Sequence, residues 1–220
     1  NQGGRTRALA YDVQNTSVLL AGSATGGIYK STDGGNNWLK TVCPANAITC
    51  IAQDCRAGKT NIWYAGTGEL SGSSGTATGA YYLGMGLLKS TDGGEHWSIL
   101  SATAGLSSTA FDSDFDGVWN IVLDSTNHTQ DEVYAATYGG IWKSLDGGNT
   151  WKKKRSGALP NYSYYTDVAI DKNGVVYGTL SSESTHKGIW RSVDGETWVS
   201  ILPSGFPAAY GRICIGIAPS

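Results

Sequence analysis

One short pattern occurs four times in this chain and constrains its fold more than any other feature. It consists of a serine, an aspartate, one or two glycines and a closing tryptophan, and its copies are STDGGNNW (31–38), STDGGEHW (90–97), SLDGGNTW (144–151) and the shorter SVDGETW (192–198). The four aspartates are 59, 54 and 48 residues apart. A period of this length is typical of chains built from repeated supersecondary units.

Each copy lies at the same place in a longer pattern of four apolar runs. In the first repeat the runs are RALAYD, SVLLAG, GGIYKS and WLKTV, with the turn between the third and the fourth. These runs are rich in β-branched and aromatic residues, which predicts a four-stranded antiparallel meander for each repeat. A lone meander cannot bury both of its apolar faces, whereas sheets stacked around an axis can. We therefore predict an all-β chain, a β-propeller made of four-stranded blades.

The repeat also predicts the blade boundaries. Four blades are expected at about 3–44, 45–104, 111–160 and 161–205, and 206–220 is expected to form the first strand of a fifth. Because radial closure needs a full ring, we expect the chain to be part of a larger propeller, with the remainder of that propeller as a partner. The absence of an initiator Met and of a signal sequence predicts a processed or trimmed product.

The residues of the repeated turn have expected structural roles. The aspartate is expected to accept backbone N–H bonds inside its own turn, and the glycine after it to adopt a positive φ. The serine is expected to hydrogen-bond across the bend, and the tryptophan to fill space between neighbouring blades. The residues concerned are Ser31, Asp33, Gly35, Trp38, Ser90, Asp92, Gly94, Trp97, Ser144, Asp146, Gly148, Trp151, Ser192, Asp194 and Trp198.

This pattern resembles the Asp-box, or BNR, repeat, and the resemblance covers the whole chain at four sites. Families with this repeat include sialidases, xyloglucanases, sortilin-type receptors and secreted bacterial multi-blade surface proteins. The resemblance implies that the four aspartates are architectural and lie away from any catalytic centre. The opening GGRTRALAYD…TGGIYKSTDGGNNW resembles large bacterial extracellular repeat proteins exported by a dedicated outer-membrane route. That resemblance implies an extracellular or cell-surface location.

Composition argues against several classes of partner. The net charge is −2 and only 15% of residues are charged, so neither nucleic acid nor an anionic membrane is expected as a partner. No apolar run approaches the roughly 18 residues of a membrane span. The cysteines form no C-x-x-C pair, which favours buried free thiols, with a disulfide among the first three as the alternative. They are Cys43, Cys50, Cys55 and Cys214.

Two enzyme families can be compared with the chain directly. Sialidases use an Arg-Ile-Pro motif and an arginine triad, and the sequence has no Arg-Ile-Pro and only scattered arginines. The xyloglucanase pattern Y-A-R-T-D-x-G-G-x-Y resembles LLAGSATGGIYKS (19–31), but the position of that family's first catalytic carboxylate falls on Ala24. Glycoside hydrolysis generally needs two carboxylates. Glu69 stands near the corresponding point of the second blade, where a single surface glutamate is usually just solvated.

No other catalytic set emerges from the sequence, and no catalytic residue is assigned. His96, His128 and His186 lie in three different turns or loops, and G-x-S-x-G is absent. The histidines are therefore expected at the surface.

One connector has the character of a metal loop. DSDFDG (112–117) matches the opening of a calcium loop through Asp112, Asp114 and Asp116, but Leu123 replaces the glutamate expected at the twelfth position. We expect an Asp-rich connector that caps its own backbone, with calcium as the alternative. No other cofactor is expected.

The longest loops are expected on one face, which the second-to-third-strand loops share with the connectors between blades. Long loops on a rigid scaffold are where recognition is usually placed. Aromatic residues in these loops suit a sugar ring or a protein partner, although they can instead pack down on their own loops. KKKR (152–155) is interpreted as a solvated strand edge and not as a nucleic-acid site. The candidate ligand-binding residues are Glu69, Tyr81, Tyr82, Tyr162, Tyr164 and Tyr165, with Phe111 nearby.

Together these features favour a secreted, non-catalytic propeller module of an adhesin-like or cell-surface protein. It would bind protein or glycan through its long-loop face. The alternative is part of a polysaccharide-degrading glycoside hydrolase of xyloglucanase-like type, with its catalytic carboxylates outside the matched positions. An intracellular assembly scaffold is a third possibility that fits the low charge.

Overall fold

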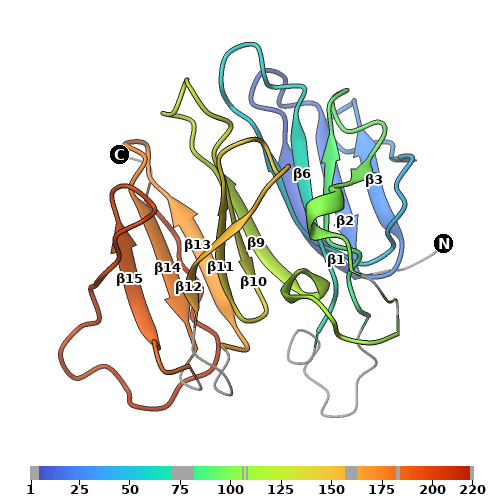
Figure 1. Ribbon diagram of the computed structural model, residues 1–220. Coiled ribbons are helices and arrows are strands. Elements are labelled where there is room, and N and C mark those ends of the chain that lie inside the picture. Colours follow the sequence, from blue (N-terminus) through green and yellow to red (C-terminus); the bar gives the residue numbers. More distant parts are fainter. Residues whose placement is uncertain are drawn as a thin grey trace. The chain divides into compact units, whose positions relative to one another are not determined.

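The fold is all-β, as predicted. The computed structural model describes residues 5–70, 82–105, 107, 109–156, 163–181 and 184–218. Within these ranges the strands form four four-stranded antiparallel sheets, each made of strands consecutive in the sequence (Figure 1). The only helical segments in the described residues are two three-residue 3-10 turns, Ser101–Thr103 and Asp114–Asp116. The chain divides into two compact units, Asn1–Val118 and Trp119–Ser220.

The first unit contains two meanders. Its first sheet is formed by β1 (Thr6–Tyr11), β2 (Leu19–Ser23), β3 (Gly27–Ser31) and β4 (Leu39–Lys40). Its second is formed by β5 (Ile48–Gln53), β6 (Trp63–Thr67), β7 (Leu87–Ser90) and β8 (Ser98–Ile99). The sheets pack closely: a Cβ atom on Gly22 would lie 2.5 Å from the Ile48 side chain. The core residues are Leu20, Ile28, Ala45, Ile48, Trp63, Ala65, Leu88 and Trp97.

The second unit repeats this organisation. One sheet is formed by β9 (Val118–Leu123), β10 (Val133–Thr137), β11 (Gly140–Ser144) and β12 (Lys152–Ser156). The other is formed by β13 (Thr166–Ile170), β14 (Val176–Leu180), β15 (Gly188–Ser192) and β16 (Val199–Ser200). Ile141 approaches Gly178, where an added Cβ would lie 2.3 Å from its terminal methyl group. Ile141 and Val168 are completely buried, so alternating apolar residues hold these two sheets together.

The repeated turn joins the third and fourth strand of every sheet and is closed by local hydrogen bonds. In the first copy, the Ser31 hydroxyl donates to Asp33 Oδ1 (2.8 Å) and accepts from the Gly35 amide (2.9 Å). Asp33 Oδ1 also accepts from the Asn37 amide at 2.9 Å. Gly34 has φ +73°, a region that glycine enters without a Cβ clash. Trp38 Nε1 donates to the Gly35 carbonyl at 2.9 Å.

The second and third copies reproduce these bonds, and the shortened fourth copy keeps only part of them. Ser192 still donates to Asp194, which accepts from the amides of Glu196 and Thr197. The residue missing from this turn is the second glycine. In the other three copies the carbonyl of that glycine accepts a hydrogen bond from the tryptophan indole N–H. The buried Trp198 Nε1 consequently has no hydrogen-bond partner in the described residues.

The segment after the last sheet, 201–218, has no assigned strand. It is attached by a bond from the Thr179 hydroxyl to the Ile213 carbonyl (3.0 Å) and one from the Ile215 amide to Asp167 Oδ2 (3.0 Å). A β-strand is defined by its pairing, and these residues form no ladder with another strand among the described ranges. The fifth blade, like the blade boundaries, therefore stays a prediction.

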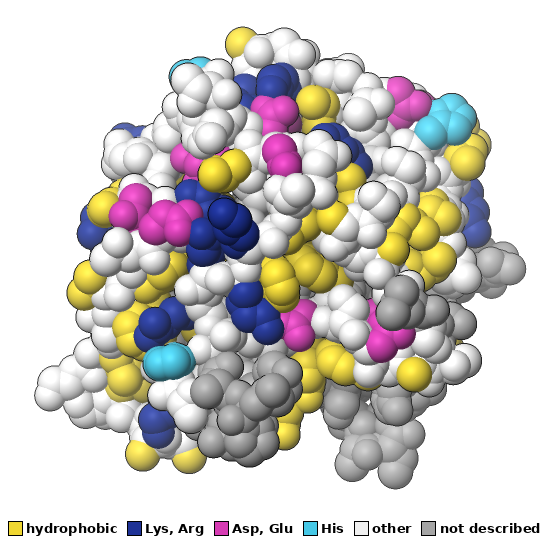
Figure 2. All heavy atoms as spheres, viewed as in Figure 1, with side chains coloured by type: hydrophobic (Ala, Val, Ile, Leu, Met, Phe, Trp, Pro, Cys, Tyr) yellow, Lys and Arg dark blue, Asp and Glu magenta, His cyan; other side chains and the backbone are white. Residues whose placement is uncertain are grey.

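The surface mixes charges and apolar groups. Figure 2 shows basic and acidic side chains interspersed with hydrophobic ones on the visible face. No helix in the described residues is long and apolar enough to cross a membrane. All four cysteines are free, but Cys55 and Cys214 are exposed, so the expectation of buried thiols is wrong for these two. They lie outside the strands that form the two cores.

Candidate functional site

In the second unit, aromatic side chains gather at the end of the strands where the β10–β11 loop meets the connector before β13. The rings of Tyr138 and Tyr164 stack, with centroids 5.5 Å apart and an interplanar angle of 27°. Tyr164 is 46% exposed. One ring therefore supports the other and leaves part of it open to a ligand.

Trp119 holds this connector in place. Its indole N–H donates to the Tyr164 carbonyl at 3.1 Å, and its ring lies 5.5 Å from that of Tyr165. Trp119 is only 4% exposed, and Tyr165 is half-buried. Tyr165 thus packs on Trp119 of β9, whereas Tyr164 stays more exposed.

In the first unit, Glu69 follows the end of β6 and forms an antiparallel bridge with Tyr82. The two residues exchange backbone hydrogen bonds of 2.7 and 2.8 Å. Glu69 is 4% exposed and its carboxylate forms an ion pair with Arg5. The expectation of a solvated surface glutamate is therefore wrong: Glu69 is buried, and Arg5 balances its charge. Tyr82 itself is 49% exposed.

The loop that carries Glu69 lies tightly against the Asp-rich connector. Gly68 has φ +95°, and a Cβ atom there would lie 2.1 Å from the Asp116 carbonyl oxygen. That carbonyl accepts a 2.7 Å bond from the Gly84 amide. Any side chain at position 68 would clash with this carbonyl, so the position requires glycine. The close contact also fixes the backbone next to Glu69.

The acidic connector binds its own backbone. Asp116 Oδ2 accepts from the amides of Asp112 (2.8 Å) and Ser113 (2.9 Å) and completes a capping box with Ser113. Burial raises the pKa of Asp116, while the two amide bonds act in the opposite direction. Asp112, Asp114 and Asp116 do not converge, and no three His, Cys, Asp or Glu side chains in the described ranges come together as a metal site.

The position matched to a catalytic carboxylate carries a methyl group. Ala24 is 5% exposed, and its amide donates to the Arg5 carbonyl at 3.0 Å. The backbone is thus held in place at this position, and its side chain carries no acid.

The remaining sequence-predicted residues are dispersed. Each of the four turn aspartates bonds within its own turn, so they are not brought to a common site. His96, His128 and His186 are exposed. Phe111 is 46% exposed. Tyr81 and Tyr162 lie outside the described residues.

Sequence reasoning missed three contributors to these sites. Arg5, Trp119 and Tyr138 were not among the candidates, although Tyr138 in TYGG follows a second strand just as Glu69 does in TGEL. That shared position was the signal that could have found Tyr138. The partnership of Arg5 with Glu69 spans 64 residues and has no local signal.

Comparison with curated proteins relates the chain to part of a polysaccharide-degrading enzyme. It is 27% identical over 217 residues to xyloglucanase Xgh74A of Acetivibrio thermocellus. The match covers 86% of this chain and 24% of Xgh74A, so the chain spans about a quarter of the length of that relative. No protein-family model matches the chain.

Solved structures agree on the fold. The GH74 enzyme of Niastella koreensis superposes with a TM-score of 0.64 at 20% identity, covering 94% of this chain and 31% of that one. The extracellular domain of BT4673 from B. thetaiotaomicron gives a TM-score of 0.57 at 16% identity, covering 90% and 22%. The chain has a β-propeller fold and corresponds to a part of each of these longer chains.

Proposed function

We propose that this chain is a glycan-binding segment of an extracellular β-propeller related to the xyloglucanases, and that it binds polysaccharide without cleaving it. The similarity to Xgh74A over 86% of the chain carries the proposal. The extracellular location is supported by the resemblance of the repeated turn and by the likeness to the extracellular domain of BT4673.

The stacked tyrosines supply a suitable platform. The C–H face of a pyranose ring packs on an exposed aromatic ring, and the tyrosine hydroxyl can bond to sugar hydroxyls. Tyr164 is supported by Tyr138, and its backbone is fixed by Trp119, so little conformational freedom is lost on binding. A neutral polysaccharide is therefore the expected ligand class.

Cleavage is disfavoured by the residues at the other candidate positions. Hydrolysis uses an acid together with a base or nucleophile, and Ala24 provides neither. Arg5 binds the ionised form of Glu69, which does not serve as a general acid. A second carboxylate would have to come from another part of the parent protein.

Affinity electrophoresis in gels containing xyloglucan tests binding by the 220-residue chain. Tyr164→Ala is expected to weaken binding about tenfold, because it removes one stacking contact worth roughly 1.4 kcal/mol. Tyr11→Ala is the matched control, since Tyr11 is a 58% exposed tyrosine on β1 that takes no part in the stacked pair. Equal losses for the two variants, or no retardation of the unmodified chain, would refute the platform.

A reducing-sugar assay on the same substrate tests turnover. No release is expected from this chain. Release that disappears in Glu69→Gln would instead assign hydrolysis to the chain, with Glu69 as base or nucleophile.

A second candidate is a non-catalytic binding module of a cell-surface protein, favoured by the likeness to the extracellular domain of BT4673. The two proposals differ in the full-length polypeptide. If the chain is a segment of a xyloglucanase-related enzyme, the full-length polypeptide releases sugar from xyloglucan through carboxylates outside this chain, whereas a cell-surface binding module binds its ligand and releases none.

A further inference from the structure

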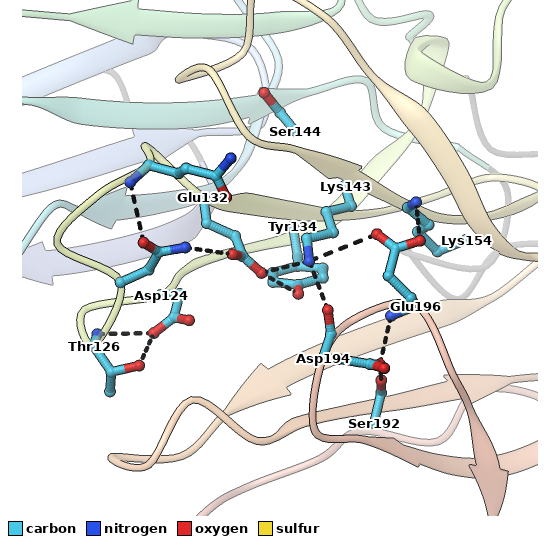
Figure 3. Close-up of polar contacts among 12 residues, drawn as sticks. Asp124, Thr126, Glu132, Tyr134, Lys143, Ser144, Lys154, Ser192, Asp194 and Glu196 are labelled. Atoms are coloured by element: carbon cyan, nitrogen blue, oxygen red, sulfur yellow. Dashed lines mark hydrogen bonds and ion pairs between the residues drawn. The ribbon is translucent and has the colours of Figure 1, made fainter.

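At the turn end of the second unit, Lys143 on β11 stands at the centre of a buried polar network (Figure 3). Its Nζ lies 2.8 Å from Glu132 Oε1 and donates to the Asp194 carbonyl at 2.7 Å. The Lys143 side chain is only 5% exposed. The Tyr134 ring lies below the ammonium group at 5.4 Å from the centroid.

Glu132 completes this network. Its second oxygen accepts a 2.9 Å bond from Asn127, and its first also accepts from the Tyr134 hydroxyl. The buried lysine and glutamate therefore balance one another, and their hydrogen-bonding capacity is largely used.

Beside this network lies a hollow of about 360 Å³, lined by Lys143, Leu145, Thr150, Lys152, Lys154 and Glu196. A volume of this size accommodates a monosaccharide or a smaller anion. Glu196 is 51% exposed and projects between two lysines: it pairs with Lys154 through one oxygen and lies 3.8 Å from Lys143 through the other. Among the described residues, the exposed Lys152 ammonium has no ion-pair or hydrogen-bond partner.

The first unit shows that the extra lysines are not needed for the fold. There Lys30, which precedes Ser31 as Lys143 precedes Ser144, pairs with Glu95 of the next turn at 2.7 Å. Leu39 faces Lys30 in the strand register, as Lys152 faces Lys143. The equivalent position in the first unit thus has one lysine and one glutamate, and the second unit has additional lysines there.

From this surplus we propose that the hollow is a binding site for a small oxyanion, either a phosphate group or the carboxylate of an acidic sugar. Lysine ammonium groups bind such anions as point charges. Without a bound anion, the Glu196 carboxylate lies between the lysines. When an anion binds, this carboxylate moves aside, and the exposed position of Glu196 permits that movement. The site lies at the opposite end of β11 from Tyr138, so it is separate from the proposed glycan platform.

Titration calorimetry at low ionic strength tests this with the 220-residue chain and three probes: inorganic phosphate, galacturonate and galactose. Phosphate, galacturonate or both are expected to bind, with an affinity that falls as salt is added. Galactose is expected not to bind at this site. The anion that binds with the higher affinity shows whether the natural ligand carries a phosphate group or a sugar carboxylate.

Three variants separate a built site from diffuse attraction. Lys152→Ser is expected to weaken anion binding about tenfold, because a charge-assisted contact is lost. Lys153→Ser is the matched control: it removes the same charge from the next residue of β12, whose ammonium lies over the Trp142 ring at 5.0 Å. It is expected to change the affinity less than about twofold. Glu196→Gln is expected to raise the affinity about threefold or more, because it removes the competing carboxylate.

The proposal is overturned by any of three results: neither anion binds at millimolar concentration, the two lysine variants lose affinity equally, or Glu196→Gln weakens binding. Loss of glycan binding in Tyr164→Ala with retained anion binding would show that the two sites are independent.

Discussion

At the scale of single residues, the serine and aspartate side chains of the repeated turn form hydrogen bonds with groups no more than four positions away. The hydroxyl of Ser90 donates to Asp92 at 2.8 Å and accepts from the Gly94 amide at 2.9 Å. Ser90 is 1% exposed, so these bonds are shielded from water. Because the partners of the serine and aspartate side chains lie within the motif, these bonds could be predicted from the sequence, as could the positive φ of the glycine after the aspartate.

The ionised form of Asp92 is favoured in the folded state. Burial acts to raise its pKa, but bonds from the His96 amide, the His96 ring and Ser90 outweigh that effect and lower the pKa from 3.8 to about 2. A lowered folded-state pKa contributes stability that is present above the unfolded value and lost as pH falls through the folded one. The contribution is therefore complete above about pH 4 and disappears toward pH 2.

Asp92→Asn is expected to destabilise the chain at pH 7 by roughly 1 kcal/mol or less, since the group is exposed and screened. The difference from the unmodified chain is expected to shrink at pH 2.5. Urea unfolding at the two pH values measures it. A constant difference between pH 7 and 2.5 would contradict a role for the charge.

At the scale of elements, the fourth turn shows what one missing glycine changes. Trp151 and Trp198 are both half-buried and close equivalent hairpins of the second unit. Trp151 Nε1 donates to Gly148 at 3.0 Å, whereas Trp198 Nε1 is buried without a partner among the described residues. The sequence showed the deletion, but only the structure shows the orphaned indole group.

Replacement of each tryptophan by phenylalanine compares these two hairpins. Both changes remove similar volume, but Trp151→Phe also breaks a hydrogen bond. It is expected to cost about 1 kcal/mol more than Trp198→Phe in free energy of unfolding. Denaturant titration measures the two costs, and a larger loss for Trp198→Phe would contradict the hydrogen-bond argument.

At the scale of the whole molecule, the four equivalent sheets differ in what covers them, and among the described residues one face of the first sheet is exposed. Leu9 pairs with Ala21 in the first sheet as Val168 pairs with Gly178 in the fourth, yet Leu9 is 67% exposed and Val168 is completely buried. Tyr11 and Val13 are also exposed at 58% and 44%. In the second unit the third sheet packs against the fourth and covers Val168. The burial of this strand position therefore depends on whether a neighbouring sheet packs on it.

Serine substitutions at these two positions distinguish the open face from the covered one. In the 220-residue chain, Leu9→Ser is expected to change stability by less than about 0.5 kcal/mol, as for other surface positions. Val168→Ser is expected to cost roughly 2–4 kcal/mol, because it leaves a cavity and buries a hydroxyl group. Thermal unfolding monitored by tryptophan fluorescence measures both. Equal costs would mean that the Leu9 face is covered in this chain.

The sequence by itself determined the four meanders, the place of the turn in each and the bonds inside it, because strand periodicity and turn chemistry are local. Only the tertiary structure decided that Glu69 is buried against Arg5, that Tyr164 stacks on Tyr138, and that three lysines and a glutamate line one hollow. Those contacts join residues from different strands, loops and turns. Their geometry follows from strand register and from the packing of neighbouring sheets, which no local pattern encodes.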